Sequence, residues 1–183
     1  MMAAHHNWAI HESPLGRLTL FGGPDGISNL YFRGRSPRVS EAARTEMPEA
    51  AAQLDAYFAG RRQAFDLTLD LRGTAFHRAV WRLLLEIPYG TTSTYGELAR
   101  RIDSSMYPTD VEPHRHAQLV GGAIGANPVP ILIPCHRVIG ADGSLTGYRG
   151  GLQRKRALLD LEAAGGAGGA SVPRHGNRQL SIL

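Results

Sequence analysis

The period of the hydrophobic pattern changes near Gly73, and this change limits the folds open to the chain. Before it, turns rich in Gly and Pro separate three apolar or alternating runs, which predict a small antiparallel sheet over residues 7–12, 17–22 and 27–32. After it, apolar residues recur at the three-and-four spacing of helices. Strands followed by helices favour an α+β fold. We expect two domains and a flexible tail, over residues 1–70, 71–164 and 165–183.

Several local signals place the helices. Pro48 suits the first turn of a helix, Thr74 can cap a second, and Thr92 or Ser93 can cap a third. The third and fourth helices predict a helix-turn-helix, although the connection over 103–112 is longer than the usual turn. The first domain is interpreted as a scaffold. The five predicted helices lie at residues 48–58, 75–87, 94–102, 113–125 and 153–163.

Charge is distributed unevenly along the chain. Residues 1–70 carry a net charge of −1 and residues 71–183 a net charge of +5, and 19 of the 20 basic residues are Arg. Because Arg binds phosphate in a bidentate manner, the second part suits an anionic partner such as nucleic acid. A genome that prefers Arg codons would also explain the scarcity of Lys. No apolar run reaches the roughly 18 residues of a membrane span, and no signal peptide is evident, so we expect a cytoplasmic protein.

Three prolines in the segment 127–134 disfavour a helix interior or a central strand, and predict an extended, buried segment that leads to Cys135. Cys135 is the only cysteine, so an internal disulfide is excluded and we expect no metal site. A lone thiol is either a small buried hydrophobe or a reactive group. His136 and Arg137 follow it directly and can activate it, and Glu162 on the last helix is a candidate to orient the imidazole.

The motif Pro134-Cys135-His136-Arg137-Val138 and its flanking residues resemble a known active-site signature. Asn127-Pro128-Val129-Pro130-Ile131 precedes it, and Gly147-Tyr148-Arg149-Gly150-Gly151-Leu152 follows it. Together they resemble the methylated-DNA–protein-cysteine methyltransferases, also called O6-alkylguanine-DNA alkyltransferases. The resemblance covers most of residues 73–163 and reaches the amino terminus more weakly. It implies a ribonuclease-H-like amino-terminal domain joined to a winged or helix-turn-helix carboxy-terminal domain.

The resemblance also implies a role for each matching residue. Cys135 would accept the alkyl group, His136 would be its water-linked base, and Glu162 would orient His136. Asn127 would tie the helix-turn-helix to the active-site segment, and Tyr95 would bond the extruded guanine. The guanine pocket would include Tyr95, Pro130, Val138, Tyr148 and Arg149. The expected DNA contacts are Thr94, Arg115, Ala117, Gln118, Gly121, Gly122 and Arg137.

Activity of this kind needs no cofactor, because the thioether formed on the cysteine is stable and each molecule acts once. The expected substrate is double-stranded DNA that contains O6-alkylguanine, with O4-alkylthymine as a second lesion. The damaged nucleotide must be flipped out of the duplex to expose its alkyl group. We expect the protein to act as a monomer.

The sequence departs from the family pattern in two places. Gln118 stands where relatives carry an arginine that fills the space of the flipped nucleotide, and Arg115 could replace it in part. The second departure is an acidic insertion over 103–113, which should weaken DNA binding unless it folds away from DNA. Both changes concern the flipping of the base more than the chemistry.

Three other functions are compatible with parts of the sequence. A lesion-binding relative would bind alkylated DNA with little transfer, but such homologues replace the cysteine. A cysteine hydrolase would use Cys135, His136 and Glu162, although papain-like enzymes place their histidine far from the cysteine. A transcription regulator would use only the helix-turn-helix.

Overall fold

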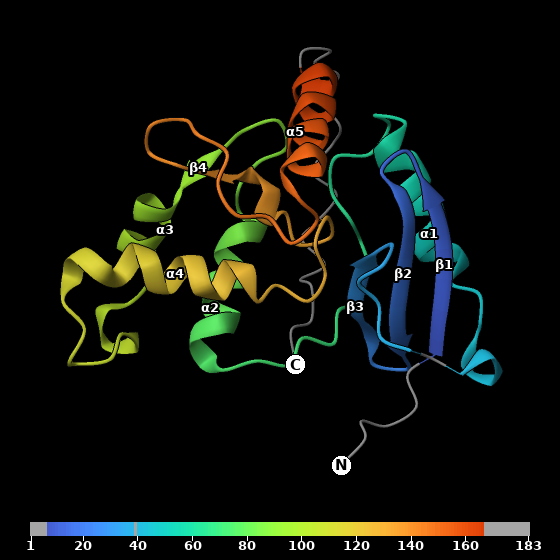
Figure 1. The fold of residues 1–183 in the computed structure, drawn as a ribbon, viewed down its shortest axis with the longest axis horizontal. Coiled ribbons are helices and arrows are strands. Elements are labelled where there is room, and N and C mark those ends of the chain that lie inside the picture. Colours follow the sequence, from blue (N-terminus) through green and yellow to red (C-terminus); the bar gives the residue numbers. More distant parts are fainter. Residues whose placement is uncertain (1–6, 39, 167–183) are drawn as a thin grey trace.

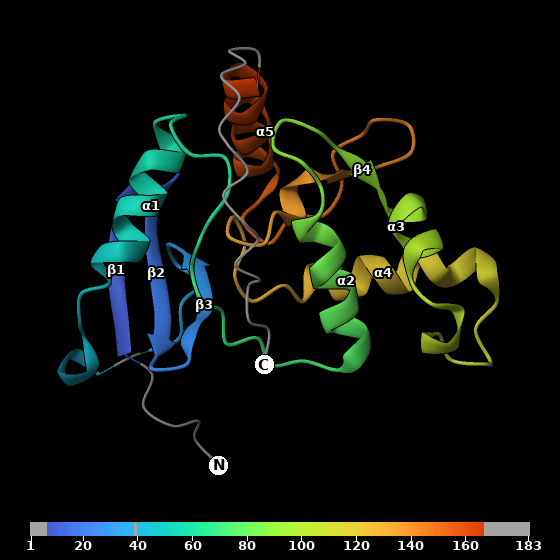
Figure 2. The ribbon, with the colours of Figure 1, turned by 180° about the vertical axis from the view of Figure 1, so that it is seen from behind.

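The computed structural model describes residues 7–38 and 40–166. The first domain is an antiparallel sheet in the order β1-β2-β3, with α1 over one face (Figures 1 and 2). The predicted sheet and the predicted helix at 48–58 are therefore confirmed. The predicted tail lies outside the described residues from position 167 onward. The bounds are β1 (Asn7–Ser13), β2 (Gly16–Gly23), β3 (Gly26–Phe32) and α1 (Pro48–Phe58).

Alternate residues of the sheet form the core beneath α1. Leu18 pairs across the strands with Phe32, and Leu20 pairs with Leu30, so all four side chains share one face. They are at most 2% exposed, and Leu54 of α1 is fully buried in the same core. The period-two pattern of the sequence is thus the pattern of side chains that face the helix.

The strand β3 joins the two halves of the molecule. Gly26 has a φ of +124°, and a Cβ atom at this position would lie 2.5 Å from the Thr68 carbonyl oxygen. Because Gly26 lacks that atom, the segment around Thr68 can pass beside β3. There the Ile27 amide donates to the Thr68 carbonyl, and the Ile27 carbonyl accepts from the Asp70 amide. Further along β3, the Leu30 amide donates to the carbonyl of Pro128 at 2.8 Å, which connects the sheet to the segment that precedes Cys135.

The second domain is mainly helical, which confirms the predicted change from strands to helices near Gly73. Thr74 caps α2 as expected, but Thr94, not Thr92 or Ser93, caps α3. The Thr94 hydroxyl accepts from the Glu97 amide and the Glu97 carboxylate accepts from the Thr94 amide, a reciprocal capping box. The helices are α2 (Ala75–Leu85), α3 (Tyr95–Arg101), α4 (His116–Gly125) and α5 (Leu152–Gly166).

Shorter elements connect these helices. The strands β4 (Ser93–Thr94) and β5 (Val138–Ile139) form a parallel pair that the sequence did not predict. The 3-10 helices are η1 (Glu41–Ala43), η2 (Ser104–Met106), η3 (Pro113–Arg115) and η4 (Cys135–Arg137). The predicted fourth helix therefore starts as a 3-10 turn and becomes α-helical at His116. Within the part of the chain that the structure describes, no helix is long and apolar enough to cross a membrane.

The inserted segment between α3 and α4 is anchored by one aromatic residue. The Tyr107 ring stacks on His116, the first residue of α4, with a centroid separation of 3.6 Å and an interplanar angle of 4°. Its hydroxyl donates to the Ala99 carbonyl at 2.8 Å, and its ring packs edge-on against Phe76. One insertion carboxylate, Asp103, accepts from the Ser105 amide at the start of η2. The insertion thus fixes the beginning of α4 against α3 and α2.

Candidate active site

The segment before Cys135 is buried, as predicted, but it forms a tight turn where we expected an extended chain. Ile131 has a φ of +78°, and the Ile133 amide donates to the Val129 carbonyl at 2.9 Å. The Asn127 side chain spans this turn: its amide donates to the Ile133 carbonyl at 2.9 Å, and its oxygen accepts from the Val129 amide at 3.0 Å. Asn127 is 1% exposed, so these bonds are shielded from water and hold the turn that positions Cys135.

Cys135 lies on the wall of a cavity of about 520 Å³ between α3, α4 and the loop before α5. Its side chain is only 5% exposed. The hydroxyl of Tyr95, across the cavity, accepts a hydrogen bond from Thr146 at 3.1 Å. The lining residues are Tyr95, Ala117, Gln118, Gly121, Ile124, Gly125, Asn127, Cys135, Thr146, Gly147, Tyr148 and Arg149.

Most residues predicted for the pocket line this cavity, but two do not. Pro130 lies in the tight turn, where it bridges to Ile133, and Val138 pairs with Ser93 in the β4-β5 sheet. Both are buried and neither lines the cavity as the structure shows it, so their assignment to the guanine pocket stays a prediction. The Val138 carbonyl is also already engaged, because it accepts from the buried Lys155 ammonium at 2.5 Å.

Burial raises the pKa of the Cys135 thiol to about 11, although a hydrogen bond with Asn127 and the charges of Lys155 and Arg149 lower it in part. The thiol is therefore protonated at neutral pH, and its use as a nucleophile requires a base. His136 is the neighbouring base. Burial lowers the pKa of its imidazole, so the ring is neutral at pH 7 and able to accept a proton.

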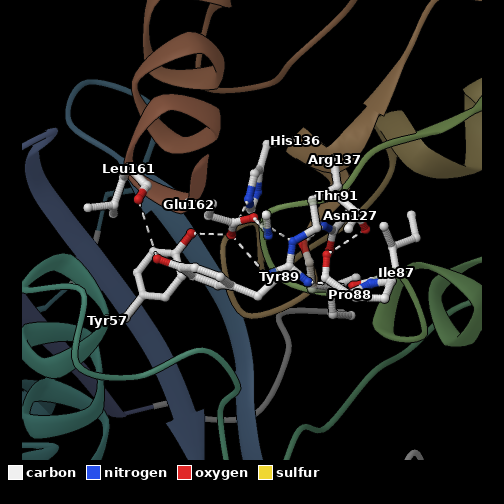
Figure 3. A network of polar contacts seen from close by, with 12 residues as sticks. Tyr57, Ile87, Pro88, Tyr89, Thr91, Asn127, His136, Arg137, Leu161 and Glu162 are labelled. Carbon is white, nitrogen blue, oxygen red and sulfur yellow. Dashed lines mark hydrogen bonds and ion pairs between the residues drawn. The ribbon is translucent and has the colours of Figure 1, made fainter. Parts of the chain in front are cut away.

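One carboxylate, Glu162, organises the residues behind the thiol (Figure 3). It lies on α5 and is fully buried. Its Oε1 atom accepts from His136 Nε2 at 2.9 Å and from the Tyr57 hydroxyl at 2.7 Å, and its Oε2 atom accepts from the Gly90 amide at 3.2 Å. A hydrogen bond to Glu162 at Nε2 places the proton of the neutral imidazole on that nitrogen. The other ring nitrogen, Nδ1, is buried and bonds to no group in the described residues, so it is the atom that can accept a proton.

Arg137 completes the network and is not free to contact DNA as we expected. Its Nε and Nη2 atoms donate to the Glu162 carboxylate at 2.9 and 2.8 Å, and its Nη1 atom donates to the Ile87 carbonyl at 2.7 Å. The Arg137 side chain is 8% exposed. Although burial opposes ionisation of Glu162, hydrogen bonds from His136 and Arg137 lower the pKa of this carboxyl to about 2.

Sequence reasoning missed two buried polar groups near the thiol, one inside the Glu162 network and one outside it. Tyr57 comes from α1 of the first domain, 105 residues before Glu162, so the first domain is more than a scaffold. In the sequence it is one more apolar residue on the inner side of a helix. Lys155 is the other, a lysine fully buried beneath the cavity, which donates to the carbonyls of Val138 and Thr146. No pattern in the sequence separates it from the neighbouring Arg154, which is half-buried, and Arg156, which is exposed.

The remaining predicted DNA contacts lie on α4 or directly before α3 and α4. Thr94 caps α3, Arg115 is exposed in η3, and Gly122 is exposed on α4. A Cβ atom at Gly121 would lie 3.6 Å from the Tyr95 ring, so α4 and α3 approach closely beside the cavity. Within residues 7–38 and 40–166, no group of three or more His, Cys, Asp or Glu side chains could hold a metal ion.

Comparison with known proteins matches both domains. Residues 7–71 match the 6-O-methylguanine DNA methyltransferase ribonuclease-like domain, and residues 75–164 match the DNA-binding domain of the same family. A methylated-DNA–protein-cysteine methyltransferase of Mycolicibacterium paratuberculosis is 48% identical over 155 residues, which cover 82% of this chain and 88% of the relative. The chain belongs to the 6-O-methylguanine DNA methyltransferase family. The sequence-based assignment of family and fold is thus confirmed.

Other members of this methyltransferase family agree in sequence and in fold. A methylated-DNA–protein-cysteine methyltransferase of Methanosarcina acetivorans is 42% identical over 168 residues, covering 86% of this chain and 98% of the relative. The crystal structure of Mycobacterium tuberculosis OGT in complex with DNA superposes with a TM-score of 0.74 at 45% identity, covering 87% of this chain and 94% of that chain. The two-domain arrangement described above is therefore that of the family.

The buried network makes the protein sensitive to acid. The Glu162 pKa of about 2 lies below the ordinary 4.5, so between these values the unfolded chain binds a proton that the folded chain does not. The stabilisation is therefore present above pH 4.5 and is lost as the pH falls toward 2. The pKa of buried His136 lies below its ordinary 6.5, so below pH 6.5 the unfolded chain again binds a proton more readily than the folded chain. His136 therefore also lowers the free energy of unfolding as the pH falls. Urea midpoints should decrease steadily from pH 7 to pH 3, and a midpoint that is constant over this range would contradict the network.

Proposed function

We propose that the protein repairs double-stranded DNA by moving an alkyl group from O6 of guanine, and from O4 of thymine, to the sulfur of Cys135. The observation that carries this proposal is the position of Cys135, whose thiol lines a cavity beside α4 while the His136–Glu162 pair lies behind it. A nucleophile, a base and a group that orients the base are the components of an activated-thiol site. The cavity opens beside the predicted helix-turn-helix, where a flipped base would enter.

The reaction consists of one displacement and two proton transfers, one that activates the thiol and one that protonates the departing guanine. The Cys135 proton passes through a water molecule to His136 Nδ1, and the imidazolium that forms is stabilised by Glu162. The thiolate attacks the alkyl carbon, a carbon–sulfur bond forms, and the carbon–oxygen bond to guanine breaks with its electron pair on O6. Because Thr146 donates to the Tyr95 oxygen, the Tyr95 proton is free to be donated to the departing guanine. The proton held by His136 then returns through water to Tyr95, so that both residues end in their starting states.

The product explains why one protein molecule repairs one lesion. A thioether is not hydrolysed at neutral pH, so Cys135 stays alkylated, and restored guanine returns to the duplex. Neither step requires a cofactor. We further propose that the protein acts as a monomer in the cytoplasm, where reducing conditions keep the thiol available.

Intact-mass measurement tests this function directly. The protein is incubated with a duplex that contains one O6-methylguanine, and an undamaged duplex is the control. A gain of one methyl group, mapped to Cys135 and reaching one equivalent at most, is the expected result. An unchanged mass with tight lesion-selective binding would favour a lesion sensor and overturn the proposal. Repeated turnover of an ester or amide would indicate a hydrolase.

The glutamine on the cavity wall should limit the rate of repair. Gln118 lines the cavity at the position where relatives carry arginine, and its amide lacks the charge and planar surface of a guanidinium. Gln118→Arg should therefore raise the single-turnover methyl-transfer rate by about tenfold, the effect of one charge-assisted contact. Gln118→Met, which keeps the length but not the amide, is the control and should slow transfer. An unchanged rate in Gln118→Arg would show that other residues hold the flipped state.

A further inference from the structure

The cavity at Cys135 contains one charged side chain that the mechanism above does not use. Of the residues that line the cavity in the described part of the chain, only Arg149 carries a full charge at neutral pH. The resemblance to the family assigned this position to the pocket wall, where main-chain groups bind the base. Arg149 lines the cavity and is nevertheless exposed to solvent, so it is accessible to a ligand that enters there.

The first domain holds the Arg149 side chain in place. Its guanidinium lies over the ring of Tyr31 in β3, 6.0 Å from the ring centroid, and its Nη1 atom donates to the Asn127 carbonyl at 3.5 Å, the outer limit of a hydrogen bond. Within residues 7–38 and 40–166, no carboxylate lies within 4.0 Å of this guanidinium. Arg149 is thus positioned by weak contacts and keeps donors available for an anion.

The two other arginines near the active site are already engaged. Arg137 pairs with Glu162, and Arg154 donates to the carbonyls of Leu15 and Gly150. The helix α4 offers no cation to the cavity, because Gln118 stands at its cavity-facing position. An anion brought to this cavity by a flipped nucleotide would therefore meet Arg149.

We propose that Arg149 binds the backbone phosphate of the flipped nucleotide, and that Tyr31 of the first domain positions its guanidinium for this contact. A nucleotide whose base enters the cavity carries its phosphates to the cavity mouth, and a guanidinium binds a phosphate through two parallel hydrogen bonds. This contact supplies, from the loop before α5, a cation that α4 does not offer to the cavity. The inference rests on the proposed function and adds a substrate-binding residue to it.

Two substrates separate phosphate binding from other roles of Arg149. One is a duplex with a single O6-methylguanine, and the other is the free base O6-benzylguanine, which has no phosphate and has a benzylic carbon that is readily displaced. Arg149→Ala should slow transfer from the duplex at least tenfold more than transfer from the free base. It should also reduce the slope of log binding constant against log salt concentration by about 1, the contribution of one phosphate contact. Arg149→Lys, which keeps the charge, should recover part of the loss.

Further variants serve as controls and test the role of Tyr31. Arg156→Ala removes the same charge from an exposed position on α5 outside the cavity. It should change neither the ratio of the duplex and free-base transfer rates nor the salt dependence of duplex binding. Tyr31→Leu should slow duplex repair and add nothing in the Arg149→Ala background, whereas Tyr31→Phe should keep the wild-type rate. Equal losses on both substrates, or no loss on the duplex, would overturn the proposal. If neither substrate alkylated the wild-type protein, that result would instead contradict the proposed function.

Discussion

Cys135→Ser should abolish alkyl transfer while the variant still folds and binds DNA. Burial already holds the pKa of the thiol at about 11, and a serine hydroxyl in the same place is far less acidic and less nucleophilic. The neutral His136 cannot remove a proton from such a group at a useful rate. Intact mass after incubation with O6-methylguanine duplex measures transfer, and fluorescence anisotropy with the same duplex measures binding.

A second substitution at this position distinguishes loss of chemistry from loss of structure. Cys135→Ala removes the heteroatom altogether. It should match Cys135→Ser in its lack of transfer, and in its free energy of unfolding within about 1 kcal/mol, because the side chains are similar in size. Methyl transfer that persists in either variant would place the acceptor on another residue. Both results are read against wild-type protein at the same DNA concentration.

The sequence could predict the active-site residues because they share one short motif, but it could not give the directions of their side chains. Cys135, His136 and Arg137 form a 3-10 turn, in which successive side chains point about 120° apart. Cys135 therefore faces the cavity, while His136 and Arg137 both reach Glu162. The family resemblance implied that Arg137 would contact DNA, and only the geometry of the turn shows that its side chain is buried against Glu162.

Contacts between distant segments were harder to predict than local elements. The cap at Thr74 and the turn at Gly26 depend on neighbouring residues, and both can be recognised in the sequence. The bond from Tyr57 to Glu162 depends on how α1 packs beside α5, which no local pattern encodes. The same holds for Tyr31, whose ring meets Arg149 only because β3 lies beside the cavity loop.

Glu162→Gln should cause the largest loss of stability among single changes in the active site. The carboxylate accepts hydrogen bonds from His136, Tyr57, Gly90 and Arg137, and its removal leaves the buried Arg137 guanidinium without a counter-charge. Breaking a buried ion pair in this way costs about 3–5 kcal/mol. We therefore expect a large decrease in the urea midpoint, and a single-turnover transfer rate well below wild type at temperatures where the variant stays folded.

Two further variants show whether the cost arises from the unpaired guanidinium. Asp160→Asn removes an equal charge from an exposed position on the same helix and should change stability by less than about 0.5 kcal/mol. Arg137→Met combined with Glu162→Gln removes both charges and should recover part of the stability lost in Glu162→Gln, but not the transfer rate, because His136 remains without its carboxylate. If the double variant were less stable than Glu162→Gln, the loss would stem from packing and not from the buried charge. If instead it recovered the transfer rate, Glu162 would not be the group that orients His136.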